Sequence, residues 1–334
     1  MRAALVREFG PVDQLTVETI ADPEATAGHV VIDIHATAVN FVDLLVITGK
    51  YQFLPPRPFA PGKLPCGVVS AVGPDVTSLK VGDRVLTLHE QGGYAEKVRV
   101  PAHDCYVLPD RLSFVDAAAM SLAYDTAWFA LCERGRAKAG ESVLVLGATG
   151  GVGLAAVQLA RAYGLHVLAA VSAPGKAQQV LDAGAHGVVD LSQGDLIDSL
   201  RDQVRAQTDG KGVDIVIDTL GGDVFNAAIR AIAWRGRLVV VGFATGRIPT
   251  LKVNYVMLKN IEVSGLQVSD YRKRTPDEMA HCIREIFRLV EAGALRPSAV
   301  TRYPLEDVAS ALTALQSRQA SGRLVLTMNE TASL

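Results

Sequence analysis

A glycine-rich turn between an apolar strand pattern and a helical pattern constrains the fold of this chain more than any other feature. Residues 143–146 read Val-Leu-Val-Leu and run directly into the segment Gly147–Gly153, after which apolar residues recur at helical spacing as far as Gly164. Such a turn lets backbone N–H groups approach a pyrophosphate at the positive end of the helix. Ordinary tight turns also use glycine, but the flanking patterns supply the context that the motif requires. The stretch therefore predicts a dinucleotide-binding unit.

Strand and helix patterns alternate on both sides of this turn. We expect strands at 142–146, 166–171, 187–190, 213–217, 237–241 and 261–263, with helices between them, for example at 175–183, 195–207 and 223–233. This order predicts an α/β fold, in which helices cover both faces of a doubly wound parallel sheet.

The first 110 residues are β-rich instead. Residues 29–38 alternate as a half-buried strand does, and short glycine-bounded strands surround a proline-rich loop at 55–62, which indicates a compact β barrel or sandwich. The composition changes at Ser113, and 114–134 is expected to be helical. Two late strands, 299–303 and 323–327, are expected to fold back onto the first domain. The predicted domains are 1–118 with 267–334, and 119–266.

Composition and charge exclude several classes of protein. The net charge of −2 gives no electrostatic reason to expect nucleic acid. Four scattered cysteines without a CxxC pair indicate neither a zinc knuckle nor a disulfide framework, and they fit a cytoplasmic protein. No run approaches the ~18 apolar residues of a membrane helix, and the N-terminus is interrupted by charge too early for a signal peptide.

The chain resembles the zinc-independent medium-chain dehydrogenases/reductases, in their NADPH:quinone oxidoreductase (ζ-crystallin-like) branch. The segments that carry the resemblance span most of the chain: Asn40–Asp43, Gly49–Tyr51, Pro61-Gly62, Val81–Val85, Gly92–Glu96, Leu146–Ala160, Gly212–Asp214, Gly221-Gly222 and Ser321–Arg323. The resemblance implies a GroES-like β-rich catalytic domain, an inserted Rossmann domain, NADPH in the cleft and a homodimer. The last strand region, 261–266, would otherwise be an exposed sheet edge.

The same resemblance argues against a metal. Zinc-dependent relatives carry a cysteine where this chain has Asn40, a Gly-His-Glu where it has Gly62-Lys63-Leu64, and a third ligand near Tyr124. Catalytic zinc needs about three nitrogen, sulfur or oxygen ligands from the protein, so no metal site is predicted. His89 and Glu90 are adjacent in a predicted loop and are expected to form a solvated surface.

The cofactor is predicted to be NADPH from the end of the second strand. NAD-preferring sheets place an acidic residue there for the ribose 2′-OH, whereas this chain has Ser172 and Lys176, with no acid before Asp182. Ser172 could instead cap the next helix while Lys176 is solvated. Relatives often add a tyrosine after the third strand, where this chain reads Val-Asp-Leu at 189–191. The preference for NADPH is therefore expected to be weaker than usual.

The resemblance also implies the other site residues. Asn40, Tyr51 and Thr126 are expected at the nicotinamide, Gly150, Gly151 and Val152 at the pyrophosphate, Leu220, Gly242 and Phe243 along the ribose path, and Arg323 from the tail. Without this role, Asn40 would be a strand-end turn residue and Tyr51 would pack on the prolines.

Three functions remain open from the sequence. The first is hydride transfer from NADPH to a quinone. The second is reduction of an activated C=C bond in an enone or enoyl thioester, which needs a proton donor such as Tyr51 or Tyr124. The third is a non-enzymatic cofactor- or RNA-binding role, against which the charge argues. Relatives differ from this chain at Leu45 and Asp125, near the expected acceptor site, so the acceptor itself stays open.

Overall fold

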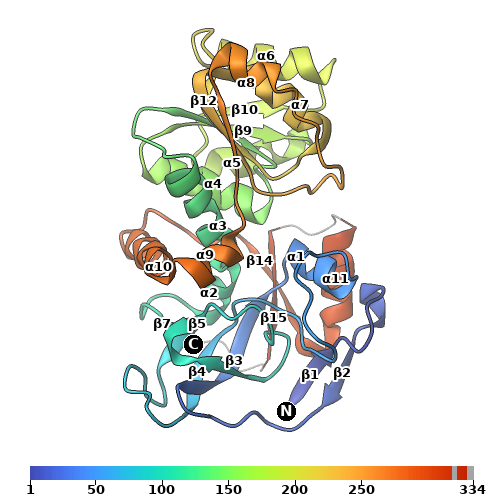
Figure 1. The fold of residues 1–334 in the computed structure, drawn as a ribbon, viewed down its shortest axis with the longest axis vertical. Helices are drawn as coiled ribbons and strands as arrows, with labels where there is room; N and C mark the ends of the chain where they lie inside the picture. The colour runs from blue at the N-terminus through green and yellow to red at the C-terminus, as the bar shows by residue number, and fades with distance from the viewer. Residues whose placement is uncertain (318–321, 329–334) are drawn as a thin grey trace. The chain divides into compact units, whose positions relative to one another are not determined.

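The computed structural model describes residues 1–317 and 322–328, and the chain divides into two compact units. The first unit comprises residues 1–122 and the tail from Pro297, and the second comprises Ala123–Arg296 (Figure 1). Within the described residues, no helix is both long enough and apolar enough to cross a membrane.

The first unit is built on one large sheet. Its strand order is β14 (Val300–Pro304), β15 (Arg323–Thr327), β3 (His29–Ala38), β4 (Cys66–Val72), β5 (Arg84–Thr87) and β7 (Cys105–Val107), and β6 (Lys97–Pro101) also pairs with β3. A separate antiparallel pair joins β1 (Arg2–Leu5) to β2 (Thr16–Thr19). The tail strand β15 runs antiparallel to β3, with Val325 opposite Ala38. This pairing confirms that the tail folds back onto the β-rich part of the chain.

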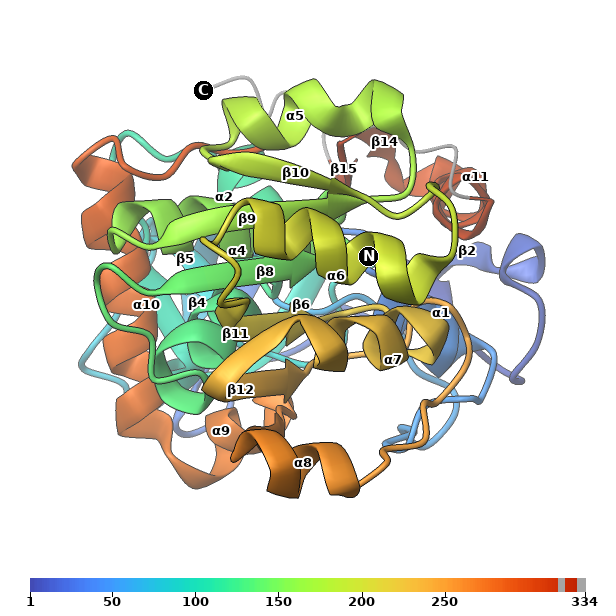
Figure 2. The ribbon, with the colours of Figure 1, turned by 90° about the horizontal axis from the view of Figure 1, so that it is seen from above.

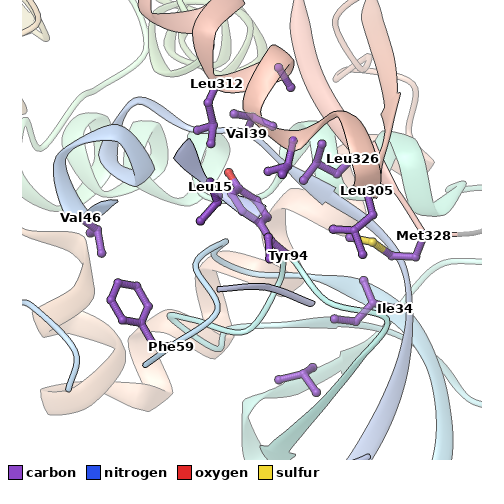
Figure 3. Packing of buried hydrophobic residues seen from close by; sticks show 14 of the residues in the cluster. Leu15, Ile34, Val39, Val46, Phe59, Tyr94, Leu305, Leu312, Leu326 and Met328 are labelled. Atoms are coloured by element: carbon purple, nitrogen blue, oxygen red, sulfur yellow. The ribbon is translucent and has the colours of Figure 1, made fainter. Parts of the chain in front are cut away.

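The helices of the first unit are α1 (Phe41–Ile47), α2 (Phe114–Met120) and α11 (Val308–Gln316). Apolar side chains from the beginning and the end of the chain pack together in its core. The fully buried ring of Tyr94 lies among Leu15, Leu312 and Leu326, as Figure 3 shows.

The second unit is a doubly wound sheet of six parallel strands. Their order is β10 (Gly187–Asp190), β9 (His166–Val171), β8 (Ser142–Leu146), β11 (Val213–Asp218), β12 (Ile232–Val240) and β13 (Glu262–Gly265). The helices α4 (Gly151–Ala162), α5 (Ala177–Asp182), α6 (Leu196–Ala206), α7 (Gly222–Ala231) and α8 (Asn254–Lys259) connect the strands (Figure 2). This is the Rossmann strand order, and it confirms the predicted fold class.

Two segments differ from the sequence expectation. The helix expected over 114–134 is broken into α2 and α3 (Ala123–Trp128), because Leu122 adopts a left-handed conformation with φ of 57°, and α3 continues into a π-helical stretch, Phe129–Arg134. The helices α9 (Val268–Arg274) and α10 (Pro276–Glu291), expected with the β-rich domain, belong to the second unit. In that unit the His281 ring of α10 lies edge-on to Trp128 of α3. The exact domain boundaries stay a prediction.

Candidate active site

The glycine turn forms a backbone cradle at the carboxyl end of β8. Gly147 has φ of +69°, and a Cβ added there would lie 2.5 Å from the Thr219 Oγ1 atom. A Cβ on Gly153 would lie 2.2 Å from the Gly147 carbonyl oxygen, so α4 packs directly on the turn. Gly150 precedes α4, and among the described residues no side chain caps this helix end. The first amide groups of α4, from Gly151 and Val152, therefore lie at a helix end that begins with glycine and carries no side-chain cap, which suits a pyrophosphate.

The end of β11 meets this turn, and the segment that follows β12 is bonded to the end of β11. Thr219 Oγ1 donates a hydrogen bond of 2.9 Å to the Leu146 carbonyl oxygen. One carboxylate oxygen of Asp218 accepts from the backbone N–H of Leu220 at 2.8 Å, and the Asp218 carbonyl oxygen accepts from Gly242 N at 3.3 Å. The predicted residues Leu220 and Gly242 are thus held by one strand end, and Phe243 follows them with 38% of its surface exposed.

Sequence reasoning missed Asp218, although an acid that ends a buried strand was a visible signal. Burial raises the pKa of its carboxyl group, and the backbone N–H groups of Leu220 and Gly221 oppose that rise. Its second oxygen, Oδ2, is buried and has no hydrogen-bond partner among the described residues. The Asp218 carboxylate therefore stabilises the loop that contains Leu220 rather than facing solvent.

Ser172 and Lys176 are both exposed, in the segment that follows β9. A carboxylate lies closer to this strand end than the sequence suggested, because Asp190 of β10 is directly opposite Val171 in the parallel register. Asp190 accepts hydrogen bonds from the Ser192 hydroxyl and amide and from Gln193. These bonds, those from Ser192 first, lower the pKa of Asp190. The carboxylate is thereby held within its own loop.

In the first unit, Asn40 and Arg323 contact each other although they are 283 residues apart. The Arg323 Nη2 atom donates to Asn40 Oδ1 at 2.7 Å, and its Nε atom donates to the Ala119 carbonyl oxygen at 3.0 Å. Asn40 is also the N-cap of α1, and its backbone N–H donates to Asp43 Oδ2 at 2.8 Å. The side chain and the backbone of Asn40 are therefore each held by a hydrogen bond.

Asp43 and Tyr94 extend this arrangement into the core. The Tyr94 hydroxyl donates to Asp43 Oδ2 at 2.8 Å, and both residues are buried. Burial raises the pKa of the Asp43 carboxyl group, while its hydrogen bonds and the charges of Lys63 and Arg323 act in the opposite direction. Burial, and then the neighbouring Asp43, raise the pKa of the Tyr94 phenol.

Lys63 completes what we call the polar cluster, defined as Asn40, Asp43, Lys63, Glu90, Tyr94 and Arg323. The Lys63 ammonium group forms an ion pair with the Glu90 carboxylate and lies 5.7 Å from the centroid of the Tyr51 ring. The expectation that His89 and Glu90 form a solvated surface is therefore wrong, because Glu90 pairs with a lysine that is only 6% exposed. The Tyr51 ring also lies edge-on to the Phe53 ring, with the two centroids 6.2 Å apart.

The remaining predicted residues, Tyr124 and Thr126, belong to α3 of the second unit. Tyr124 is 3% exposed, and its hydroxyl donates to the Arg296 carbonyl oxygen at 3.1 Å. Thr126 is buried and donates to the carboxylate of Asp125, which pairs with Arg272. The hydroxyl of Tyr124 is thus engaged by the backbone of its own unit.

Two family models match the chain: an alcohol dehydrogenase GroES-like domain over residues 26–110 and a zinc-binding dehydrogenase over 151–285. The chain is 36% identical to the quinone oxidoreductase of Homo sapiens over 98% of its own length and 97% of that protein. It is 34% identical to quinone oxidoreductase-like protein 2 of Mus musculus, over 98% and 92% of the two chains.

The chain belongs to the quinone oxidoreductase family. Its fold agrees, since the structure of the Escherichia coli quinone oxidoreductase complexed with NADPH matches it with a TM-score of 0.89 at 28% identity, over 98% of this chain and all of the other. The resemblance to medium-chain dehydrogenases/reductases is thereby confirmed, and the protein is an oxidoreductase. In the described part of the chain, no three His, Cys, Asp or Glu side chains are grouped so as to hold a metal ion.

Proposed function

We propose that this enzyme transfers a hydride from NADPH to a quinone without a metal ion. The observation that carries the proposal is the backbone cradle of Gly147–Gly153, where added Cβ atoms would meet the backbone or Thr219 and where α4 begins without a side-chain cap. Its geometry fits the pyrophosphate of a dinucleotide. Relatives are named quinone oxidoreductase, and the structure of one of them is complexed with NADPH. These names support the proposed acceptor and cofactor.

The residues of this chain then have the following roles. The amides of Gly150, Gly151 and Val152 bind the pyrophosphate, Ser172 and Lys176 bind the 2′-phosphate, Leu220, Gly242 and Phe243 line the ribose path, and Asn40 and Thr126 contact the nicotinamide. Arg323 orients Asn40 through its hydrogen bond to Oδ1. Tyr51 faces the acceptor. For the alternative C=C reduction, which needs a proton donor, Tyr51 suits that role better than Tyr124, whose hydroxyl is bonded to a backbone carbonyl.

Quinone reduction asks less of the protein than alcohol oxidation does. A bound nicotinamide supplies the hydride, and the quinone is electron-poor. The protein mainly aligns the two reactants and excludes water. Among the residues proposed for the nicotinamide and acceptor, Asn40 and Thr126 are buried, which gives them fixed positions for this alignment.

The test is steady-state NADPH oxidation with a panel of quinones, enones and enoyl thioesters. We expect quinones to give the highest kcat/KM. If enones or enoyl thioesters exceed every quinone by about tenfold, or 1.4 kcal/mol, the enzyme is a C=C reductase instead. No NADPH oxidation with any acceptor would contradict both functions.

We also propose a cytoplasmic homodimer that forms through the second unit. The edge strand β13 has a free side in the sheet order, and exposed apolar residues lie on elements next to it: Trp234, Val253, Met257 and Leu258. Such edges and patches are usually covered. Light scattering at micromolar concentrations should give twice the chain mass of 35.4 kDa, and a monomer mass would contradict the dimer.

A further inference from the structure

We propose that Lys63 is a further catalytic residue, whose ammonium group stabilises the negative charge that develops on the acceptor oxygen. The proposal rests on the proposed quinone reduction. Lys63 is the only buried lysine among the described residues. Burial of an ammonium group is costly unless it is paired, and the Glu90 carboxylate is the partner of Lys63.

The surroundings of Lys63 fix its Nζ atom beside Tyr51. Nζ forms the ion pair with the Glu90 carboxylate and approaches the Glu90 carbonyl oxygen at 3.4 Å. The two loops are joined independently, since the Leu64 backbone N–H donates to the His89 carbonyl oxygen at 2.8 Å. The ion pair therefore holds the ammonium group inside the first unit. It lies 5.7 Å from the centroid of the Tyr51 ring, which is proposed to face the acceptor.

Charged groups of both signs meet in the polar cluster. Two cations, Lys63 and Arg323, act on the buried Asp43, while Glu90 carries one negative charge. Of these groups, the Lys63 ammonium group lies 5.7 Å from the centroid of the Tyr51 ring. A fixed cation in a buried setting stabilises a developing oxyanion more than water does.

Lys63 assists a hydride transfer in which it exchanges no atom. The quinone accepts a hydride, with both of its electrons, from NADPH and becomes the hydroquinone monoanion, while NADPH is oxidised to NADP⁺. A proton from water then gives the hydroquinone. Lys63 gives up no atom, because its charge acts only on the oxygen that becomes negative.

Three variants test this role. Lys63→Met keeps the length of the side chain and removes its charge, Lys63→Arg keeps the charge, and Lys97→Met removes a lysine that pairs with Asp22 elsewhere in the first unit. Loss of an oxyanion-stabilising group costs roughly 10²–10³ in kcat, and the Glu90 charge reduces that effect. We expect Lys63→Met to lower kcat for 1,4-benzoquinone at least tenfold with little change in the KM for NADPH, Lys63→Arg to recover most of it, and Lys97→Met to match the wild type.

A binding measurement separates this role from a structural one and from the proposed reaction. In spectrophotometric titrations with 4-nitrophenol, the wild type should bind the phenolate and lower the apparent pKa of the bound phenol. Lys63→Met should lose this shift, and Lys97→Met should keep it. If wild type and Lys63→Met bind the phenolate equally, Lys63 only joins two loops and the proposal fails, even if quinones are reduced. If the phenolate shift depends on Lys63 but no quinone is reduced, the proposed function fails while the anion site stands.

Discussion

The glycine turn of the second unit and the polar cluster of the first represent two ways of building a site. The turn is made of backbone, and its geometry depends on side chains that are absent, since a Cβ on Gly153 would lie 2.2 Å from a carbonyl oxygen. The polar cluster is made of side chains from distant parts of the chain, and its buried groups depend on partners that are present, such as Glu90 for Lys63 and Arg323 for Asn40. The first type should be sensitive to added atoms, and the second to lost hydrogen bonds and charges.

The largest effect is expected from Gly153→Val. Its Cβ would meet the Gly147 carbonyl and the Ala148 backbone, which flexible side-chain motion cannot relieve. Overpacking costs typically about 1–3 kcal/mol, and contacts with backbone put this variant at or above the upper end. Gly150→Ala is the matched control, because its φ is −79° and its closest contact is 3.4 Å. Urea unfolding measures the stability of both variants. Equal losses of stability would contradict the close packing of α4 on the turn.

A smaller loss of stability is expected from Arg323→Leu in the polar cluster. The variant leaves Asn40 Oδ1 and the Ala119 carbonyl without their donor, and an unsatisfied buried group costs about 1–3 kcal/mol. Arg302→Leu, on the exposed surface of the neighbouring strand β14, is the control. Arg323→Leu should lower the free energy of unfolding, measured with a chemical denaturant, and should raise the KM for NADPH. If the two arginine variants behave alike, the hydrogen bond to Asn40 has no orienting role.

Lys176, the exposed residue proposed to bind the 2′-phosphate, should change the KM for NADPH by roughly one power of ten when it is replaced. A charge-assisted contact with phosphate is worth about 1.5–3 kcal/mol, and solvent at the exposed Lys176 reduces this value. Lys176→Ala should therefore raise the KM for NADPH about tenfold and leave NADH nearly unchanged. Measuring kcat/KM with both cofactors decides the matter. Equal losses would mean that Lys176 is structural or contacts the shared pyrophosphate.

The smallest effect is a change in the pH dependence of stability. Burial raises the pKa of Asp43 above its usual 3.8, so the folded protein binds this proton more tightly than the unfolded chain does. The stabilisation is complete below the unfolded pKa and is lost as the pH rises toward the folded pKa. Asp43→Asn keeps an acceptor for Tyr94 and removes the titration. The wild type should lose stability relative to the variant as the pH rises above 4, and parallel unfolding curves would contradict this.

Local patterns made the second unit predictable. The strands 166–171 and 187–190 have the predicted bounds, because a parallel sheet and its glycine turn depend on residues close in sequence. The resemblance named Asn40 and Arg323, yet nothing local indicated that they contact each other. The pair of Lys63 and Glu90 was missed for the same reason, since the fold alone brings two loops together. The break at Leu122 was also missed, because a leucine in the left-handed region has no sequence signal.

The most direct test of the account is NADPH fluorescence titration of Gly151→Asp and Tyr51→Phe. A carboxylate in the turn would repel the pyrophosphate, whereas Tyr51 is proposed to face the acceptor. We expect Gly151→Asp to remain folded but to lose measurable NADPH binding, and Tyr51→Phe to bind NADPH as the wild type does. Near-normal NADPH affinity in folded Gly151→Asp would contradict the assignment of the turn as the cofactor site.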